Sequence, residues 1–290
     1  MAKNFPELID TRGLRIAIDD HFNWVVEHWG SDLETLFLPV LQLLGAIESF
    51  LVWLPWYLVL AAITFLAYSA TRNLKITAGV AAMMFLLGFF GLWEPAMKTT
   101  ALMLTSTLLA VVVGIPTGIL MSRSKGVEAA LLPVLDIMQT MPIFVYLIPF
   151  VMLFGPGKIP ALLATVVFAV PPVIRLTNLG IRQVDAEVIE VYTAFGATRR
   201  QLLFSVQIPL ALPTIMAGIN QTTMMALSMV VIASMIGAGG LGYQVLQGIQ
   251  RLEVSRGLLA GVAIVFLAVI FDRIAQAYGR KMQQYLHIDS

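Results

Sequence analysis

The stretch DAEVIEVYTAFGATRRQLLFSVQIPLALP, from Asp185 to Pro213, is the longest charged interruption in the apolar two-thirds of the sequence. Gly196 can supply the positive φ of a turn between two short helices, and Pro209 marks the start of the next helix. Four charged side chains make the stretch too polar for lipid: Glu187, Glu190, Arg199 and Arg200. The stretch predicts a polar loop between membrane spans; an ordinary loop with one amphipathic helix is the alternative.

The composition identifies the class of protein. Of 290 residues, 59% are hydrophobic and only 12% are charged, whereas soluble domains carry about 25% charged residues. The chain is therefore expected to be an all-α membrane protein that crosses the bilayer several times. The sequence has no cysteine, which excludes disulfides, thiolate catalysis and cysteine metal sites. No cluster of histidines and carboxylates has ligand spacing, so no metal site is predicted, and no cleaved signal peptide is visible.

Hydropathy predicts about seven spans, each close to the roughly 20 residues that a bilayer requires. We expect an amphipathic surface helix over residues 243–256, before the last span, and a basic tail after it. The polar loop occupies residues 177–213. The predicted spans cover residues 51–70, 76–93, 99–121, 129–154, 159–176, 214–236 and 257–271.

The N-terminal part of the chain is more polar. Residues 1–34 form a mostly acidic tail, and Ser31-Asp32-Leu33-Glu34 is typical of a capping box that opens a helix over residues 35–50. Pro39, Gln42 and Glu48 interrupt that helix, so we expect it to lie in the membrane interface; a true span is the alternative. The predicted parts are then an extracytoplasmic tail with an interfacial helix (1–50), two accessory transmembrane helices (51–98) and a core (99–290).

The distribution of basic residues predicts the orientation. Eleven lysines and arginines fall in one set of connections: Arg72, Lys75, Arg123, Lys125, Arg175, Arg182, Arg199, Arg200, Arg273, Arg280 and Lys281. The opposite connections hold four: Lys98, Lys158, Arg251 and Arg256. The positive-inside rule places the richer set in the cytoplasm. The polar loop and the C-terminus are then cytoplasmic, and the N-terminus is outside.

Polar residues inside spans are candidates for a translocation path. Asp136 is the only acidic residue well within a predicted span, with Gln139 close by. An acid at that depth costs about 2.5–3.5 kcal/mol on insertion scales, so it should face protein or water. No second buried acid, base or histidine is available for a proton relay. We therefore favour a residue for helix packing or path lining over a proton or ion site.

The sixth span combines polar and small residues. Its candidate path residues are Asn220, Gln221, Ser228 and Ser234, and Ala217, Gly218 and Ala233 are small. The same pattern suits close helix packing and a path at a homodimer seam, and both remain open. Four glycines follow and could form an outer gate where a binding protein docks, or a plain turn: Gly237, Gly239, Gly240 and Gly242.

The spacing inside the polar loop resembles the EAA loop of ABC-importer permeases. That pattern places a glycine six residues after the glutamate and an apolar-x-apolar-Pro sequence nine residues later, as Glu190, Gly196 and Pro209 do here. The sequence departs from the pattern at Val191 and Tyr192, where two alanines are usual. The resemblance implies that this loop couples to an ATPase. The expected coupling residues are Glu190, Tyr192, Phe195, Gly196, Ala197, Arg199, Arg200, Leu202 and Pro209.

The longer run from residue 99 to residue 271 is similar to the permeases of glycine betaine/proline betaine ABC importers. The segments PVLDIMQTMPIFVYLIPFVMLFG (133–155), EVYTAFGATRRQLLFSVQIPLALPTIMAGINQ (190–221) and ALSMVVIASMIGAGGLG (226–242) carry the resemblance. It implies a type I importer fold with a MetI-like five-helix core and extra N-terminal helices. It also implies a second copy of this chain, two ATP-binding subunits and an external solute-binding protein, in a bacterial inner membrane.

Function follows as an expectation. The sequence has no phosphate-binding loop of the form G-x-x-x-x-G-K-[ST] and no Ser/His/Asp set, so we expect a non-catalytic permease subunit whose ATP and Mg²⁺ are bound by the partner ATPase. The expected solute is glycine betaine or a related quaternary amine such as choline, moved by alternating access. A permease for another small solute such as an amino acid is one alternative, and an ATP-independent secondary transporter or channel is another. A scaffold without transport activity is a third.

Overall fold

A computed structural model describes the backbone of residues 11–288 and the side chains of residues 12–279. Residues 1–10 of the predicted tail and the basic side chains Arg280 and Lys281 lie outside those ranges. The described chain is helical throughout apart from short connections. Its elements are α1 (Thr11–Trp53), α2 (Trp56–Thr71), α3 (Leu74–Phe89), α4 (Trp93–Arg123), α5 (Lys125–Thr140), α6 (Ile143–Phe154), α7 (Lys158–Arg182), α8 (Ala186–Ala194), α9 (Arg199–Leu202), a π turn (Leu203–Gln207), α10 (Ile208–Ala233), a 3₁₀ turn (Ser234–Ile236), α11 (Leu241–Gln250) and α12 (Val254–Ile288).

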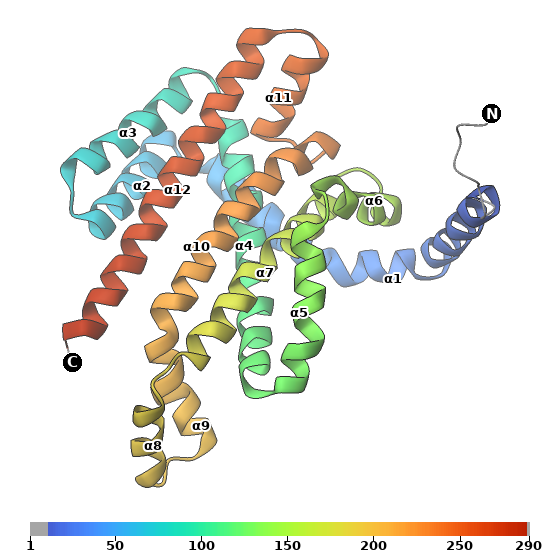
Figure 1. The fold of residues 1–290 in the computed structure, drawn as a ribbon. Helices are drawn as coiled ribbons and strands as arrows, with labels where there is room; N and C mark the ends of the chain where they lie inside the picture. Colours follow the sequence, from blue (N-terminus) through green and yellow to red (C-terminus); the bar gives the residue numbers. More distant parts are fainter. Residues whose placement is uncertain (1–10, 289–290) are drawn as a thin grey trace, which may run out of the picture.

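Helix α7 is the centre of the bundle, with α4 and α10 packed along it (Figure 1). Glycines allow these close approaches because a side chain there would overlap the neighbouring helix. A Cβ on Gly118 of α4 would lie 2.7 Å from the carbonyl oxygen of Ile174, and one on Gly218 of α10 would lie 3.2 Å from the Cα of Val173. Gly218 is thus a close packing contact with α7, one of the two roles that the sequence left open.

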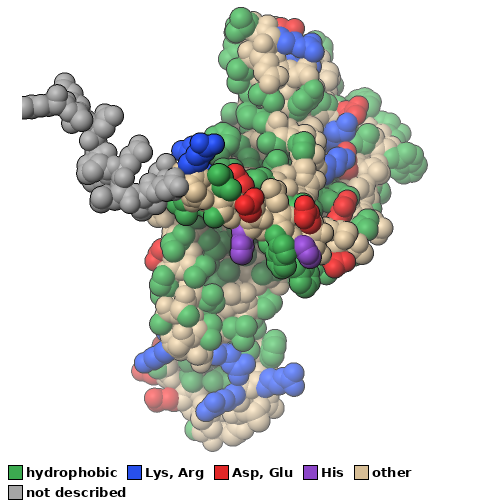
Figure 2. Space-filling view, turned by 90° about the vertical axis from the view of Figure 1, so that its right-hand side faces the viewer, with side chains coloured by type: hydrophobic (Ala, Val, Ile, Leu, Met, Phe, Trp, Pro, Cys, Tyr) green, Lys and Arg blue, Asp and Glu red, His purple; other side chains and the backbone are tan. Residues whose placement is uncertain are grey.

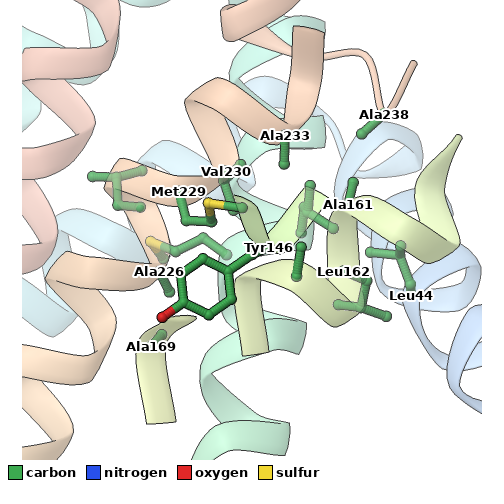
Figure 3. Close-up of a cluster of buried hydrophobic side chains, with 14 of the residues drawn as sticks. Leu44, Tyr146, Ala161, Leu162, Ala169, Ala226, Met229, Val230, Ala233 and Ala238 are labelled. Carbon is green, nitrogen blue, oxygen red and sulfur yellow. The ribbon is translucent and has the colours of Figure 1, made fainter. Parts of the chain in front are cut away.

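The predicted span over residues 129–154 is not one continuous helix: the chain breaks there into α5 and α6, which meet at 97°. Pro142 has no N–H for a helical bond, and its ring drives Met141 into the extended region, at ψ 136°. The hydroxyl of Tyr146 donates to the carbonyl of Met138 across the bend. Tyr146 is 5% exposed and lies among buried side chains of α1, α6, α7 and α10 (Figure 3), so the bend is fixed by the core.

The N-terminal helix also differs from the prediction. Helix α1 runs unbroken through Ser31, so the predicted capping box does not start a helix; instead the hydroxyl of Thr35 donates to the carbonyl of Ser31 within the helix. By length and composition α1 could cross a membrane. Figure 1 shows it lying crosswise to α4 and α5, the direction expected of an interfacial helix. Glu48 of α1 pairs with Lys158 of α7 at 2.8 Å.

The structure has fewer long spans than the seven predicted. Within the described residues, five continuous helices are long and apolar enough to cross a membrane, or six if the bent pair α5–α6 is counted as one span. Helices α2 and α3 have 16 residues each, about 24 Å. The run predicted as the first span is interrupted at Pro55. Its first residues, 51–53, belong to the end of α1, and the rest forms α2. The chain therefore has a core of α4, α5–α6, α7, α10 and α12 with extra N-terminal helices.

The surface helix predicted over residues 243–256 is instead one arm of a hairpin. Helix α11 ends at Gln250, and α12 begins at Val254 and packs back against it. A Cβ on Gly248 would lie 2.7 Å from the Cα of Gly257, so the two arms touch through their backbones. The hairpin lies at the end of the bundle opposite α8 and α9 (Figure 1).

Candidate coupling site and translocation path

The polar loop folds into two short helices joined by a turn. The side chain of Asp185 accepts from the N–H of Glu187 and begins α8, and Thr198 with Gln201 forms a capping box at the start of α9. Gly196 has φ +80° in the turn between them, as the sequence predicts. The local structure of the loop is therefore encoded by its own capping residues.

This helical pair projects from the bundle, and several of its apolar side chains are exposed. No side chain of α8 or α9 is buried. Phe195 is 89% exposed, and Val191 and Tyr192 are exposed by about half, at 53% and 46%. Figure 2 shows Lys and Arg side chains gathered around the same lower end of the molecule. Apolar side chains within a polar rim on a projecting element are typical of a protein-binding surface.

The second short helix continues into the membrane. Helix α9, the π turn and α10 follow one another without a break. The π turn ends two residues before Pro209, which has no N–H to bond within a regular helix. Arg199 and Arg200 are exposed at the tip of this rod, while Leu202 is half-buried. A movement of the tip is therefore carried along a continuous helix into the core.

Replacing Gly196 with valine is expected to distort the turn and to lower ATP-dependent transport while the chain still inserts. No atom lies within 4 Å of the added Cβ, so the cost is conformational, about 1–2 kcal/mol for a left-handed residue that is not glycine. Asparagine adopts this conformation readily, so Gly196→Asn is the control and should retain most activity. Transport and ATP hydrolysis are measured on the same preparation. Equal transport by the two variants would contradict the role of the turn.

A polar clamp connects the start of α5, the end of α4 and the end of α7, and the sequence analysis did not identify it as functional. Arg182 pairs with Glu128 at 2.6 Å and donates to the carbonyl of Met121 at 3.1 Å and to the side-chain oxygen of Asn178 at 3.1 Å. Asn178 in turn donates to Glu128 at 3.1 Å. Charged residues at the ends of spans are common, so only the fold shows that these four groups meet.

Asp136 has a charged partner within the bundle. Arg175 of α7 reaches Asp136 of α5 at 2.5 Å, and their side chains are 29% and 65% exposed. The sequence analysis did not pair them because Arg175 appeared to lie at the end of a span, whereas α7 continues to Arg182. Gln139 is also exposed on α5.

The structure separates the four path candidates of the predicted sixth span. Gln221 and Ser228 lie seven residues apart on one open side of the helix, and both are exposed. Asn220 faces α12, where it lines a small hollow with Gln276. Ser234 is fully buried and donates to the carbonyl of Val230 in the turn before it. The candidates therefore do not form one surface, and their role in a path remains a prediction.

The glycines after α10 form a compact turn. Gly237, Gly239 and Gly240 all have positive φ. The hydroxyl of Thr99 on α4 accepts from the N–H of Leu241 at 2.8 Å, and a Cβ on Gly242 would lie 2.1 Å from the carbonyl oxygen of Val231. This segment is tightly packed against α4 and α10, which agrees with the alternative of a plain turn.

Comparison with known proteins gives a family match for the core. The model of the family described as "Binding-protein-dependent transport system inner membrane component" matches residues 110–284. Two crystal structures of the MetNI methionine ABC transporter in inward-facing conformations have a similar fold. Their TM-scores are 0.59 and 0.55, both at 22% identity; they cover 66% and 64% of this chain, and the matches span 95% and 93% of those chains.

Three curated relatives extend the similarity to most of the chain. The glycine betaine/proline betaine transport system permease protein ProW of Escherichia coli (strain K12) is 47% identical, over 91% of this chain and 74% of ProW. The glycine betaine/carnitine transport permease protein GbuB of Listeria monocytogenes serotype 1/2a (strain 10403S) is 43% identical, over 87% of this chain and 92% of GbuB. The glycine betaine transport system permease protein OpuAB of Bacillus subtilis (strain 168) is 42% identical, over 89% of this chain and 92% of OpuAB.

Proposed function

This chain belongs to the family of binding-protein-dependent transport system inner membrane components, and we propose that it is the permease subunit of an ATP-driven importer of glycine betaine or a related quaternary-amine solute. The solute class rests on the relatives, which are permease components for glycine betaine. The observation that carries the permease assignment is the α8–α9 pair, which projects from the membrane core with no buried side chain.

The exposed pair is the proposed docking site for the ATPase. An amphipathic helix that enters a groove buries a few apolar anchors and leaves charged residues at the rim. Phe195 and Tyr192 are the anchors here, and Glu190, Arg199 and Arg200 form the rim. ATP and Mg²⁺ are bound by that partner, and this chain contributes no catalytic residue to hydrolysis.

The orientation follows from charge. The α4–α5 connection, the α8–α9 pair and the end of α12 lie toward the lower part of Figure 1, and the α11–α12 turn lies at the top. The connections at the lower end carry most of the basic residues, which supports a cytoplasmic lower end and an external N-terminus. The binding protein then docks on the upper end, and a second copy of this chain completes the path.

Transport proceeds by alternating access. ATP binding closes the two ATPase subunits and moves the two α8–α9 pairs with them. Because α9 continues into α10, and α8 follows directly from α7, the movement tilts the helices at the centre of the bundle. The path then opens outward, takes the solute from the binding protein, and resets after hydrolysis.

Uptake by a reconstituted complex tests this proposal. Proteoliposomes that hold this chain, its ATPase and its binding protein are expected to take up labelled glycine betaine with ATP and not with a non-hydrolysable analogue. Excess proline betaine or choline should compete, and excess methionine should not. ATP-dependent uptake of a different solute, without uptake of betaine, would keep the permease assignment and contradict the proposed substrate class. Betaine uptake by this chain alone, independent of ATP, would contradict the ABC-permease assignment.

A further inference from the structure

The pair formed by Asp136 and Arg175 lies deep in the bundle. Asp136 is eleven residues beyond Lys125, the first residue of α5, and Arg175 is seven residues before Arg182, the last of α7. At 1.5 Å per residue these positions are about 17 Å and about 10 Å from the same end of the bundle. Since the hydrocarbon core is about 30 Å thick, these depths place the pair between the boundary at that end and the middle of the core.

A charge at that depth must face protein or water. The Asp136 side chain is 65% exposed, and an aspartate that open to lipid would be costly. Gln139 and Thr140 are three and four residues further along α5, on the same helix face, and both are exposed. This polar face of α5 therefore borders the translocation path or the seam with the second copy, and not the lipid.

Arg175 has binding capacity that Asp136 does not use. Its Nη2 donates to Asp136, but its Nε is buried and has no hydrogen-bond partner among the residues that the structure describes. The Nε and Nη2 groups of a guanidinium form the fork that holds a carboxylate by two parallel bonds. An unpaired charged donor in such surroundings is unfavourable, so a carboxylate that takes both positions would bind Arg175 better than Asp136 does.

The other side of the pair suits a cation. Helix α5 ends at Thr140, four residues after Asp136, because of the break at Pro142. The carboxyl end of a helix carries partial negative charge, and here it lies beside a carboxylate inside the membrane. Positive charge without hydrogen-bond donors, as in a quaternary ammonium, would be stabilised at this place.

We propose that Asp136 and Arg175 form a transient binding site for a zwitterionic solute on the translocation path. The solute carboxylate takes the Arg175 fork, and its quaternary ammonium lies against Asp136 and the end of α5. Without solute the two side chains neutralise each other and close the site. This inference rests on the proposed function, since it assigns the residues that recognise the solute inside the permease.

Charge-neutral variants in the full reconstituted complex give the first test. Arg175→Gln removes the fork and is expected to lower the rate of glycine betaine uptake by about 10- to 100-fold at saturating solute, the factor of one charge-assisted hydrogen bond. Asp136→Asn should lower it by a similar factor. Both variants should still assemble with the ATPase. If the unaltered complex shows no ATP-dependent uptake of glycine betaine, the proposed function is contradicted. If the unaltered complex takes up betaine and Arg175→Gln does so at the same rate, only this inference is contradicted.

A charge reversal separates solute recognition from structural support. Asp136→Arg combined with Arg175→Asp restores an ion pair but places positive charge beside the negative end of α5, so uptake should stay at least about tenfold below the original. The matched control is Glu48→Lys with Lys158→Glu, a pair at 2.8 Å outside the proposed site, for which the reversal should restore uptake. Restored uptake by the Asp136/Arg175 reversal would show an ordinary structural salt bridge and overturn the proposal.

Direct contact with solute is tested by chemical modification of a thiol introduced next to the proposed site. Because the sequence has no cysteine, Gln139→Cys gives a single thiol in this chain, and modification is followed by the mass of this subunit. The probe is a methanethiosulfonate with a trimethylammonium head. We expect modification in the assembled complex, slowed by glycine betaine without ATP or binding protein, and no slowing in the Arg175→Gln background. The control thiol is Val254→Cys, exposed at the α11–α12 turn, which the same reagent should modify at a rate that betaine does not change. Equal rates with and without betaine at Gln139→Cys would overturn the proposal.

Discussion

Replacing Phe195 with alanine is expected to weaken the complex between this chain and its ATPase by roughly 30-fold or more. Phe195 is 89% exposed at the tip of the α8–α9 pair, so it contributes little to the stability of the chain itself. An aromatic anchor that becomes buried at the centre of an interface contributes at least about 2 kcal/mol, and about 1.4 kcal/mol corresponds to tenfold in affinity. The affinity of the purified ATPase for the chain in nanodiscs measures the loss.

An exposed aromatic elsewhere provides the control for Phe195. Phe65 of α2 is 69% exposed and lies on an accessory helix away from α8 and α9 (Figure 1). Phe65→Ala should leave the ATPase affinity unchanged. If Phe195→Ala binds the ATPase as well as the original chain does, the docking surface lies elsewhere on the cytoplasmic end.

Replacing Arg182 with alanine is expected to destabilise the folded chain by about 2–3 kcal/mol and to uncouple hydrolysis from transport. The change leaves Glu128, whose side chain is only 21% exposed, without its cation, and it removes the bonds to Asn178 and Met121. Arg182 is also the last residue of α7 before the segment that leads into α8. Thermal unfolding in detergent measures the stability, and the ratio of solute transported to ATP hydrolysed measures the coupling.

The matched control for Arg182 is Arg256. Its guanidinium makes a comparable set of bonds, to Gln244 at 2.9 and 2.7 Å and to Glu253 at 3.4 Å, but in the α11–α12 hairpin at the other end of the bundle. Arg256→Ala should lower stability without changing the transport ratio. If Arg182→Ala lowers transport and hydrolysis equally, the clamp supports the fold and does not transmit movement.

Much of the core could be predicted from the sequence because its signals are local. Long apolar runs predict α4, α7, α10 and α12, and the turn at Gly196 with the proline at Pro209 predicts the α8–α9 pair. The α5–α6 bend could not be found by hydropathy, since both arms are apolar and a proline in a span is compatible with a mere kink. The N-terminal capping box failed because Ser and Thr side chains also bond to carbonyls within helices, as Thr35 does.

The site was predicted less completely than the fold, because most of its interacting residues are far apart in the sequence. Glycine and aromatic residues of the coupling pair fall within one short stretch. By contrast, Asp136 and Arg175 are 39 residues apart, and Glu128 and Asn178 are 50 apart. Nothing in the periodicity of either segment indicates which polar side chain of one helix meets which of another. These pairs follow only from the way α4 and α5 pack on α7.

The bend between α5 and α6 has a consequence for how the chain enters the membrane. Helix α6 has 12 residues, about 18 Å, which is well short of the hydrocarbon thickness. It therefore cannot partition into lipid as an independent segment during synthesis. Its anchor Tyr146 stacks edge-on against Phe168 of α7, with ring centres 5.8 Å apart, and α7 emerges from the ribosome later. We therefore expect α5 and α6 to reach their final packing only after α7 has been made, a dependence on helix order that hydropathy alone does not reveal.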